Sequence, residues 1–388
     1  MKRSFSIIIL LLWSCSHDSS ISKDLNFSIE GYQKVLIEEG VTASNAIILF
    51  KDGEEVVKSI VNSNIDGDMD IDDNTIFPIW SLSKTITGIG VMILYERGLI
   101  DFKDPLSKYI PYFDNLECKD ENSEKIYYCD NEITLLDLMT HRSGYPQNNE
   151  YYPARDNKYT NLDDFVRDVA KHPVEFEPGS DYLYGASYDI LGRVIEVVSN
   201  QPFYEFLKEN IFELIGMNST KFYIDENERN NFQILFRRNN DLSEFTFEYD
   251  QNEYLPEGNG HFGGSGLVST IPDLMKFCEM LLSRGLYKNK KIISSESIDM
   301  MTTTYTKSSY KNGFYDGWDI GFSLFILNEP LFDGSNAPKG IYRFAGYHNN
   351  HFWIDYKNNL YGLLMARSIP HSKEMVHKLR SIVYNIIN

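Results

Sequence analysis

Short strand-like segments lie near both ends of this 388-residue chain, whereas the segments between them are mainly helical. Near the N-terminus, residues 46–60 form two apolar runs joined by Asp52-Gly53, which is typical of a β-hairpin. Because strands do not alternate regularly with helices, we expect an α+β fold: one antiparallel sheet built from both chain ends, flanked by helices, with an inserted mainly helical region. The C-terminal strand-like segments are residues 321–327, 350–355 and 360–367.

Helical patterns fill the middle and the end of the chain. Apolar residues recur every three or four positions between residues 86 and 95, and Gly98 then favours the end of that helix. Pro272 suits the first turn of a later helix. The segments expected to be helical include residues 81–98, 135–139, 192–198, 273–282 and 373–387.

The charge of the chain is strongly acidic. Lys and Arg total 37 against 56 Asp and Glu, which gives a formal charge of −19. Since no basic cluster offsets this excess, we expect no nucleic-acid partner. A hydrophobic content of 42% is that of a globular protein with a substantial core.

The N-terminus has the pattern of an export signal. Lys2 and Arg3 precede an apolar run over residues 7–13 that is too short to span a bilayer as an ordinary helix. The run ends in Leu12-Trp13-Ser14-Cys15, which resembles a bacterial lipoprotein box. We therefore expect a signal peptide over residues 1–15 with Cys15 lipidated, a polar tether over 16–30, a domain over 31–388, and periplasmic, membrane-anchored localisation. Ordinary cleavage nearby is the alternative, because Trp13 is bulky for its position.

Four cysteines occur in the chain. Cys118 and Cys129 flank a charged loop, and in an oxidising compartment they could form a short disulfide. Cys278 lies in an apolar helical pattern and is expected to be an unreactive core residue. Since neither Cys-x-x-Cys nor His-Glu-x-x-His occurs, we expect no metal and no cofactor.

The pattern Ser-x-x-Lys, which can pair a nucleophile with a base, occurs at Ser20–Lys23, Ser81–Lys84 and Ser308–Lys311. The first match lies in the expected tether and the third in a polar loop, so only the second precedes a long amphipathic helix. A lysine one turn after a serine lies on the same helix face, and first-turn N–H groups favour a developing negative charge. On spacing alone, an N-cap serine and a solvated first-turn lysine would be the better explanation of this match.

Further segments accompany Ser81-Leu-Ser-Lys84 along the chain: residues 104–111, 134–144, 176–179 with 184–192, 263–270 and 352–355. Their content and order resemble the serine β-lactamase and penicillin-binding protein superfamily, in its class C-like branch with related esterases and D-amino-acid peptidases. The resemblance covers the chain from about residue 45 to its C-terminus, and the ordered set is far more specific than any single motif.

The resemblance implies roles for three side chains. Ser81 would be the nucleophile that forms an acyl-enzyme, and Lys84 would accept its hydroxyl proton. Tyr184 would lie beside both residues and act as proton relay or base. A core tyrosine with a bonded hydroxyl is the alternative for Tyr184, because the chain has 26 tyrosines. His141 would brace its loop.

The third motif of this family departs from its usual form. Lactamases and carboxypeptidases carry Lys-x-Gly or His-x-Gly there and some esterases Trp-Gly-Gly, whereas this chain has Phe344-Ala345-Gly346. We expect these three residues to contact the substrate. Phe344 cannot bind a substrate carboxylate, and Arg343 should point to the other face of the strand.

Backbone groups would complete the site that the resemblance implies. The N–H groups of Ser81 and Tyr347 would form an oxyanion hole. His348 lies just beyond the third motif and could line the cleft as a further substrate contact.

These patterns predict an exported serine hydrolase that acts on a small-molecule or peptide acyl substrate, first of all a carboxylic ester. A β-lactamase or D-amino-acid peptidase is the first alternative, because the first two motifs are intact. A binding or sensor lipoprotein without turnover is the second, because the third motif is altered.

Overall fold

The computed structural model describes residues 4–120, 123, 125–147, 159–239, 244–248, 254–256, 261–307 and 316–388. The third Ser-x-x-Lys match, at 308–311, lies outside these residues.

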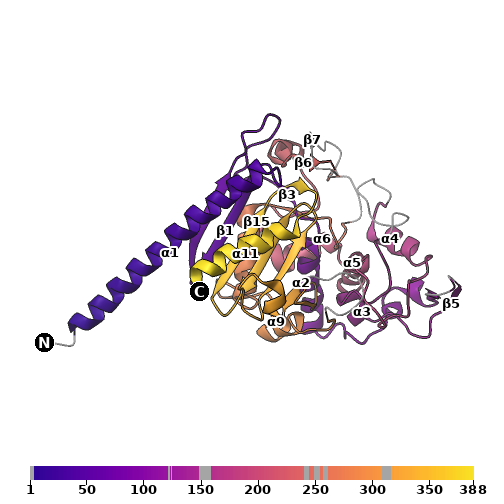
Figure 1. The fold of residues 1–388 in the computed structure, drawn as a ribbon. Helices are drawn as coiled ribbons and strands as arrows, with labels where there is room; N and C mark the ends of the chain where they lie inside the picture. Colours follow the sequence, from indigo (N-terminus) through magenta and orange to yellow (C-terminus); the bar gives the residue numbers. More distant parts are fainter. Residues whose placement is uncertain are drawn as a thin grey trace.

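A seven-stranded antiparallel sheet forms the centre of the molecule, and both chain ends contribute to it (Figure 1). The N-terminal hairpin pairs with the C-terminal strands through β1 and β15, with Ala46 opposite Met365. The α+β prediction is therefore confirmed. In spatial order the strands are β11 (Trp318–Ile320), β12 (Phe325–Leu327), β13 (Tyr342–Gly346), β14 (Asn350–Asp355), β15 (Leu360–Met365), β1 (Asn45–Lys51) and β2 (Glu54–Val61).

Helices cover both faces of this sheet, because alternate residues of its central strands are apolar on each side. On one face α1 (Ser4–Glu38) packs beside α11 (Lys373–Ile387), and the Tyr32 hydroxyl donates to the Met375 carbonyl at 2.8 Å. On the other face lie α2 (Leu82–Glu96) and α8 (Ile271–Leu282). Two separate hydrophobic clusters result, one on each side of the sheet.

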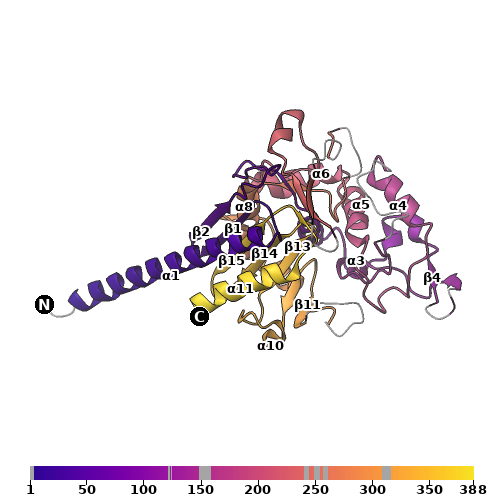
Figure 2. The same cartoon turned by 45° about the horizontal axis from the view of Figure 1, so that its top comes forward.

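The inserted region between β2 and β11 is mainly helical, as predicted (Figure 2). It packs on α2 through α5 (Figure 1). Its helices are α3 (Leu135–Met139), α4 (Leu162–Val169), α5 (Ser187–Ser199), α6 (Phe203–Leu207), α7 (Glu213–Ile215) and α9 (Ser295–Met301), with a π-helical turn at Lys208–Phe212 and 3-10 turns at Leu106–Lys108, Pro111–Phe113 and Glu226–Asn231. The minor strands are β3 (Phe77–Pro78), β4 (Glu117–Lys119), β5 (Ile126–Tyr128), β6 (Leu235–Arg238), β7 (Phe245–Glu248), β8 (Val268–Ser269), β9 (Leu286–Tyr287), β10 (Lys290–Lys291) and, near the C-terminus, β16 (Ser368–Ile369). Helix α10 (Pro330–Asp333) follows β12.

The segment 321–327, predicted as one strand, is a turn followed by a short strand. The Gly321 N–H donates to the Leu324 carbonyl at 2.9 Å, and Ser323 adopts a left-handed backbone conformation with φ of 53°. This reversal lets β12 pair antiparallel with β11.

The N-terminal helix also differs from the prediction of a polar tether over residues 16–30. Leu25 and Ile29 are fully buried against the sheet and α11, so residues 22–38 belong to the folded domain. The N-terminal part of α1 projects away from the body in both views (Figures 1 and 2). Within the described part of the chain, no helix has the length and hydrophobicity needed to cross a bilayer.

We predict that Leu25→Ala lowers the free energy of unfolding by about 2–5 kcal/mol, because it leaves a cavity under α1. Urea unfolding followed by circular dichroism measures this change. Phe27→Ala is the matched control, since the Phe27 side chain is 84% exposed and should contribute little. Equal, small effects of both substitutions would show that this part of α1 is a tether after all.

Candidate active site

Ser81 stands at the start of α2, at the end of a tightly held turn. Trp80 has a φ of 50°, a left-handed conformation that is costly for a bulky residue and is concentrated at functional sites. Two hydrogen bonds fix this turn. The Asn350 side-chain amide donates to the Pro78 carbonyl at 2.9 Å. The Ile79 N–H donates to the carbonyl of Leu267, just before β8, at 3.0 Å. The surrounding strands thus determine where the Ser81 hydroxyl lies.

The three side chains predicted to cooperate lie together. The Tyr184 hydroxyl is 2.8 Å from Ser81 Oγ, and Lys84 Nζ is 3.3 Å from the same atom. Lys84 Nζ also lies 4.6 Å from the centre of the Tyr184 ring and donates to the Gly264 carbonyl at 2.7 Å. Lys84 is only 1% exposed, which excludes the alternative of a solvated surface lysine.

Tyr184 is held in place by the loop that follows α3. His141 is buried and stacks on the Tyr184 ring with 4.6 Å between ring centres. Burial, together with the nearby charge of Lys84, keeps the pKa of His141 well below its usual value. The hydroxyls of Ser143 and Ser187 lie 2.9 Å apart and join the same loop to α5. His141 therefore acts as a neutral aromatic support, in line with the bracing role predicted for it.

Asp189 is a buried carboxylate that the sequence reasoning missed. Its Oδ1 accepts the Gly264 N–H at 2.7 Å, and the Gly264 carbonyl in turn accepts Lys84. A Cβ on Gly264 would lie 2.6 Å from Asp189 Oδ2, so only glycine permits this approach. Burial raises the pKa of Asp189 to about 6, against the lowering effects of the Lys84 charge and the Gly264 N–H.

The third motif reaches the nucleophile through its backbone. A Cβ on Gly346 would lie 2.5 Å from the Ile79 carbonyl, so the end of β13 touches the turn before Ser81. Tyr347 follows directly and is 51% exposed, with its ring edge-on to Trp80 at 5.4 Å. This approach suits the predicted pairing of the two backbone N–H groups as an oxyanion hole.

Within the third motif, Phe344 does not have the substrate-contacting position that was predicted for it. Phe344 is 3% exposed and stacks on Phe325 of β12 with 5.4 Å between ring centres. It therefore fills the core beside the site instead of lining an open cleft, whereas Ala345 is half-buried. Arg343 points to the opposite face, as predicted, with its guanidinium 4.5 Å from the Trp318 ring.

His348 lies close to the nucleophile but is almost covered. It is 3% exposed, and its ring centre is 4.5 Å from that of Trp80. Its buried position supports the conformation of Trp80 more than it offers a direct contact to a substrate.

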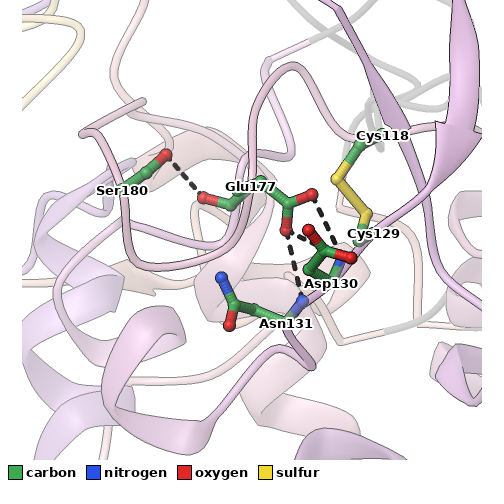
Figure 3. The surroundings of a disulfide bond; sticks show 6 residues. All are labelled: Cys118, Cys129, Asp130, Asn131, Glu177 and Ser180. Carbon is green, nitrogen blue, oxygen red and sulfur yellow. Dashed lines mark hydrogen bonds between the residues drawn. A yellow bond between two sulfur atoms is a disulfide. The ribbon is translucent and has the colours of Figure 1, made fainter.

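Cys118 and Cys129 form a disulfide with an S–S distance of 2.05 Å (Figure 3). Beside it, the Glu177 carboxylate accepts the N–H groups of Asp130 and Asn131 at 3.1–3.2 Å. Within the described residues, Cys118, Cys129 and Glu177 are the one His, Cys, Asp or Glu group spaced to hold a metal ion. Both sulfurs are bonded to each other, so they are not available as thiolate ligands.

The fold and the Ser-Lys-Tyr cluster define a serine hydrolase of the β-lactamase type. The sequence profile described as Beta-lactamase matches residues 33–382, and the chain therefore belongs to the β-lactamase family.

Relatives of this chain are distant in sequence. Protein Rv1367c of Mycobacterium tuberculosis is 24% identical over 296 residues, which span 71% of this chain and 72% of that protein. Two solved structures share the fold. EstCE1, described as a hydrolase with promiscuous acyltransferase activity, has a TM-score of 0.77 at 19% identity and covers 95% of this chain and 99% of its own. Simvastatin synthase (LovD) from Aspergillus terreus has a TM-score of 0.76 at 18% identity, over 93% and 97%.

We predict that hydrolysis of a short p-nitrophenyl ester rises with pH through an apparent pKa of about 6, as Asp189 becomes ionised. The ionised carboxylate accepts the N–H of Gly264, and the carbonyl of Gly264 accepts Lys84 Nζ, so ionisation of Asp189 strengthens the contact that positions Lys84. Asp189→Asn should remove this rise from the profile of kcat/KM against pH.

The control for this prediction is Asp273→Asn. Asp273 is also buried, in the first turn of α8. Its carboxylate accepts the Ser219 N–H and the Thr220 hydroxyl instead of a group in the active site. Loss of its charge should reduce stability without moving the pH profile. An unchanged profile in Asp189→Asn would contradict the positioning role of Asp189.

Proposed function

We propose that the protein hydrolyses carboxylic esters through an acyl-enzyme on Ser81. The observation that carries this proposal is the convergence of the Tyr184 hydroxyl and Lys84 Nζ on Ser81 Oγ, beside a third motif whose first side chain is apolar. The cluster supplies a nucleophile and a proton-transfer pair. The apolar Phe344 in the third motif favours an acyl substrate without a carboxylate at that position.

Acylation begins with attack of Ser81 Oγ on the ester carbonyl carbon. The hydroxyl proton passes to the Tyr184–Lys84 pair, of which one member is deprotonated before the attack, and from there to the leaving alkoxide, so that an alcohol departs. The backbone N–H groups of Ser81 and Tyr347 stabilise the negative charge on the carbonyl oxygen. Water then attacks the acyl-enzyme, loses a proton to the same pair, and releases the carboxylic acid while the Ser81 hydroxyl is restored.

The surroundings of the nucleophile favour an uncharged acyl group. Trp80 directly precedes Ser81 in the chain and packs against the exposed ring of Tyr347, and the two rings offer apolar contact area. The resemblance to lactamases and carboxypeptidases implies a Lys or His at the position of Phe344, where a cation would bind a substrate carboxylate. Here Phe344 is buried in the core and Arg343 lies on the other face of the sheet. The hydrolase and acyltransferase description of EstCE1 agrees with ester chemistry.

We predict that Ser81→Ala lowers kcat/KM for p-nitrophenyl butyrate by a factor on the order of 10³ or more, since no other group replaces the nucleophile. Tyr184→Phe should lower it by roughly 10²–10⁴, because the proton-transfer hydroxyl is lost. Steady-state assays on the same ester, a chromogenic cephalosporin and a D-alanyl-D-alanine peptide measure both effects and the substrate preference.

The control for Ser81→Ala is Ser199→Ala at the end of α5, whose hydroxyl bonds within its own helix. Unchanged ester turnover in Ser81→Ala would refute the nucleophile. A wild type that prefers the cephalosporin or the peptide would instead support the lactamase or peptidase alternative. Labelling of Ser81 by a fluorophosphonate without any turnover would support a sensor.

We further propose that the protein is exported and anchored to a bacterial membrane through a lipid on Cys15. The motivating features are the charged and apolar residues that precede Leu12-Trp13-Ser14-Cys15. A disulfide between Cys118 and Cys129 fits an oxidising compartment outside the cytoplasm.

We predict that cells supplied with radiolabelled palmitate label the wild-type protein, and that Cys15→Ala abolishes both the label and recovery in the membrane fraction. Cys278→Ala is the control, because Cys278 is buried in α8 and should not affect acylation. Retention of the label in Cys15→Ala would exclude Cys15 as the lipid site.

A further inference from the structure

The two backbone N–H groups of the oxyanion hole come from separate parts of the chain. Ser81 directly precedes α2, whereas Tyr347 lies in the turn between β13 and β14. Neither N–H donates to a backbone carbonyl among the described residues, so both are available to an oxygen of the substrate. Both donors must point at the same oxygen, and a displacement of about 1 Å can lower the rate about a hundredfold. The contacts that join these two segments therefore control how well the pair works.

Asn350 links the two segments directly. It is fully buried at the start of β14, and it pairs with Gly346 at the end of β13. Its side-chain amide donates to the Pro78 carbonyl at 2.9 Å. Gly346 lies against the next peptide, because a Cβ on it would stand 2.5 Å from the Ile79 carbonyl. The paired residues thus hold consecutive peptides of the turn that leads to Ser81.

The turn that carries Tyr347 ends in a left-handed asparagine. The Asn349 N–H donates to the Gly346 carbonyl at 3.2 Å, and Asn349 has a φ of 68°. Glycine is the usual residue at this position of a three-residue hairpin loop, and asparagine is among the few others that adopt the conformation readily. Asparagine also brings an amide side chain to this point of the turn, which glycine cannot do.

The Asn349 amide binds this turn to the segment before α11. Asn349 is fully buried, and its Nδ2 donates to the Ser368 and Pro370 carbonyls at 3.0 and 3.2 Å. Its Oδ1 accepts the Ser372 N–H at 2.8 Å. Ser368 belongs to β16, which pairs with β6, and the Ser372 hydroxyl caps α11 by accepting the Met375 N–H. The turn is therefore attached to a strand and to the start of a helix.

We propose that Asn349 and Asn350 are positioning residues that set the direction and spacing of the two oxyanion N–H groups. Asn350 ties the end of the turn to the segment before Ser81, and Asn349 fixes the same turn to β16 and α11. Together they prevent the Tyr347 peptide from tilting away from the Ser81 N–H. The inference rests on the proposed acyl-enzyme function, and it assigns a role to two side chains that act through the backbone and not on the substrate.

The test removes each amide and compares the effect on the transition state with the effect on substrate binding. Asn349→Gly keeps the left-handed conformation but deletes the amide, and Asn350→Ala deletes the bond to Pro78. We expect each variant to lower kcat for p-nitrophenyl butyrate by about 10- to 100-fold and to change KM by less than about threefold, because the oxyanion forms only in the transition state.

A transition-state analogue provides a second measurement. Boron of butylboronic acid bonds to Ser81 Oγ while the hydroxyl proton passes to the Tyr184–Lys84 pair, so that a tetrahedral boronate anion forms at the nucleophile. Its affinity for each asparagine variant should fall by about the same factor as kcat, since both depend on the oxyanion N–H groups. A side chain that only stabilised the fold would leave the boronate affinity of the folded protein unchanged.

The matched control is Asn359→Gly in the turn between β14 and β15. Asn359 is also left-handed, with a φ of 46°, and its N–H donates to the Tyr356 carbonyl at 3.3 Å. It is exposed at the opposite end of β14 from Asn350. Asn359→Gly should therefore leave kcat, KM and boronate affinity at their wild-type values.

Labelling of Ser81 by a fluorophosphonate, taken to completion, counts the folded sites, and all rates are expressed per labelled site. Wild-type kcat and boronate affinity in Asn349→Gly and Asn350→Ala would overturn the proposal, as would a loss confined to KM. No ester turnover by the wild type would overturn the proposed function and this inference with it. Turnover that is lost in Ser81→Ala but unchanged in both asparagine variants would overturn this inference alone.

Discussion

The burial of the Lys84 ammonium group is the constraint on which the rest of the site depends. A charge removed from water must be surrounded by acceptors, and here these are the Ser81 hydroxyl, the Gly264 carbonyl and the face of the Tyr184 ring. Each acceptor comes from a different part of the chain. The contacts of the Lys84 ammonium group therefore bring together the start of α2, the glycine-rich segment before β8 and the loop of the inserted region that carries Tyr184.

Asp189 extends this constraint by one further step. It binds the N–H of Gly264, the residue whose carbonyl binds Lys84, so a carboxylate and an ammonium group act on each other through residue 264. The two charges are buried without direct contact, which leaves Lys84 Nζ directed at Ser81. A direct Lys84–Asp189 ion pair would instead compete with the hydroxyl for the same ammonium group.

Much of this architecture could be predicted from local sequence, and the exceptions share a physical cause. Turn-forming residues predict the hairpin at Asp52-Gly53. Helical periodicity predicts the helix after Ser81, and the alternation of strand residues predicts the face of the sheet to which Arg343 points. The burial of Phe344 depends instead on a ring from a neighbouring strand, and that of Leu25 on a helix more than 300 residues away. In the sequence, Asp189 looks like any acidic residue in the first turn of a helix. Its role depends on Gly264, which lies 75 residues further along the chain and donates its N–H to the Asp189 carboxylate.

Strand β13 joins the two faces of the molecule. Phe344 and Gly346 face the nucleophile side, whereas the Arg343 side chain points to the opposite face of the sheet, where it lies over the Trp318 ring. A shift of this strand would move the Tyr347 N–H relative to Ser81 and the Arg343 guanidinium relative to Arg380 together, because the backbone between them is continuous. Arg343, the residue before the third motif, therefore directs its charge away from Ser81.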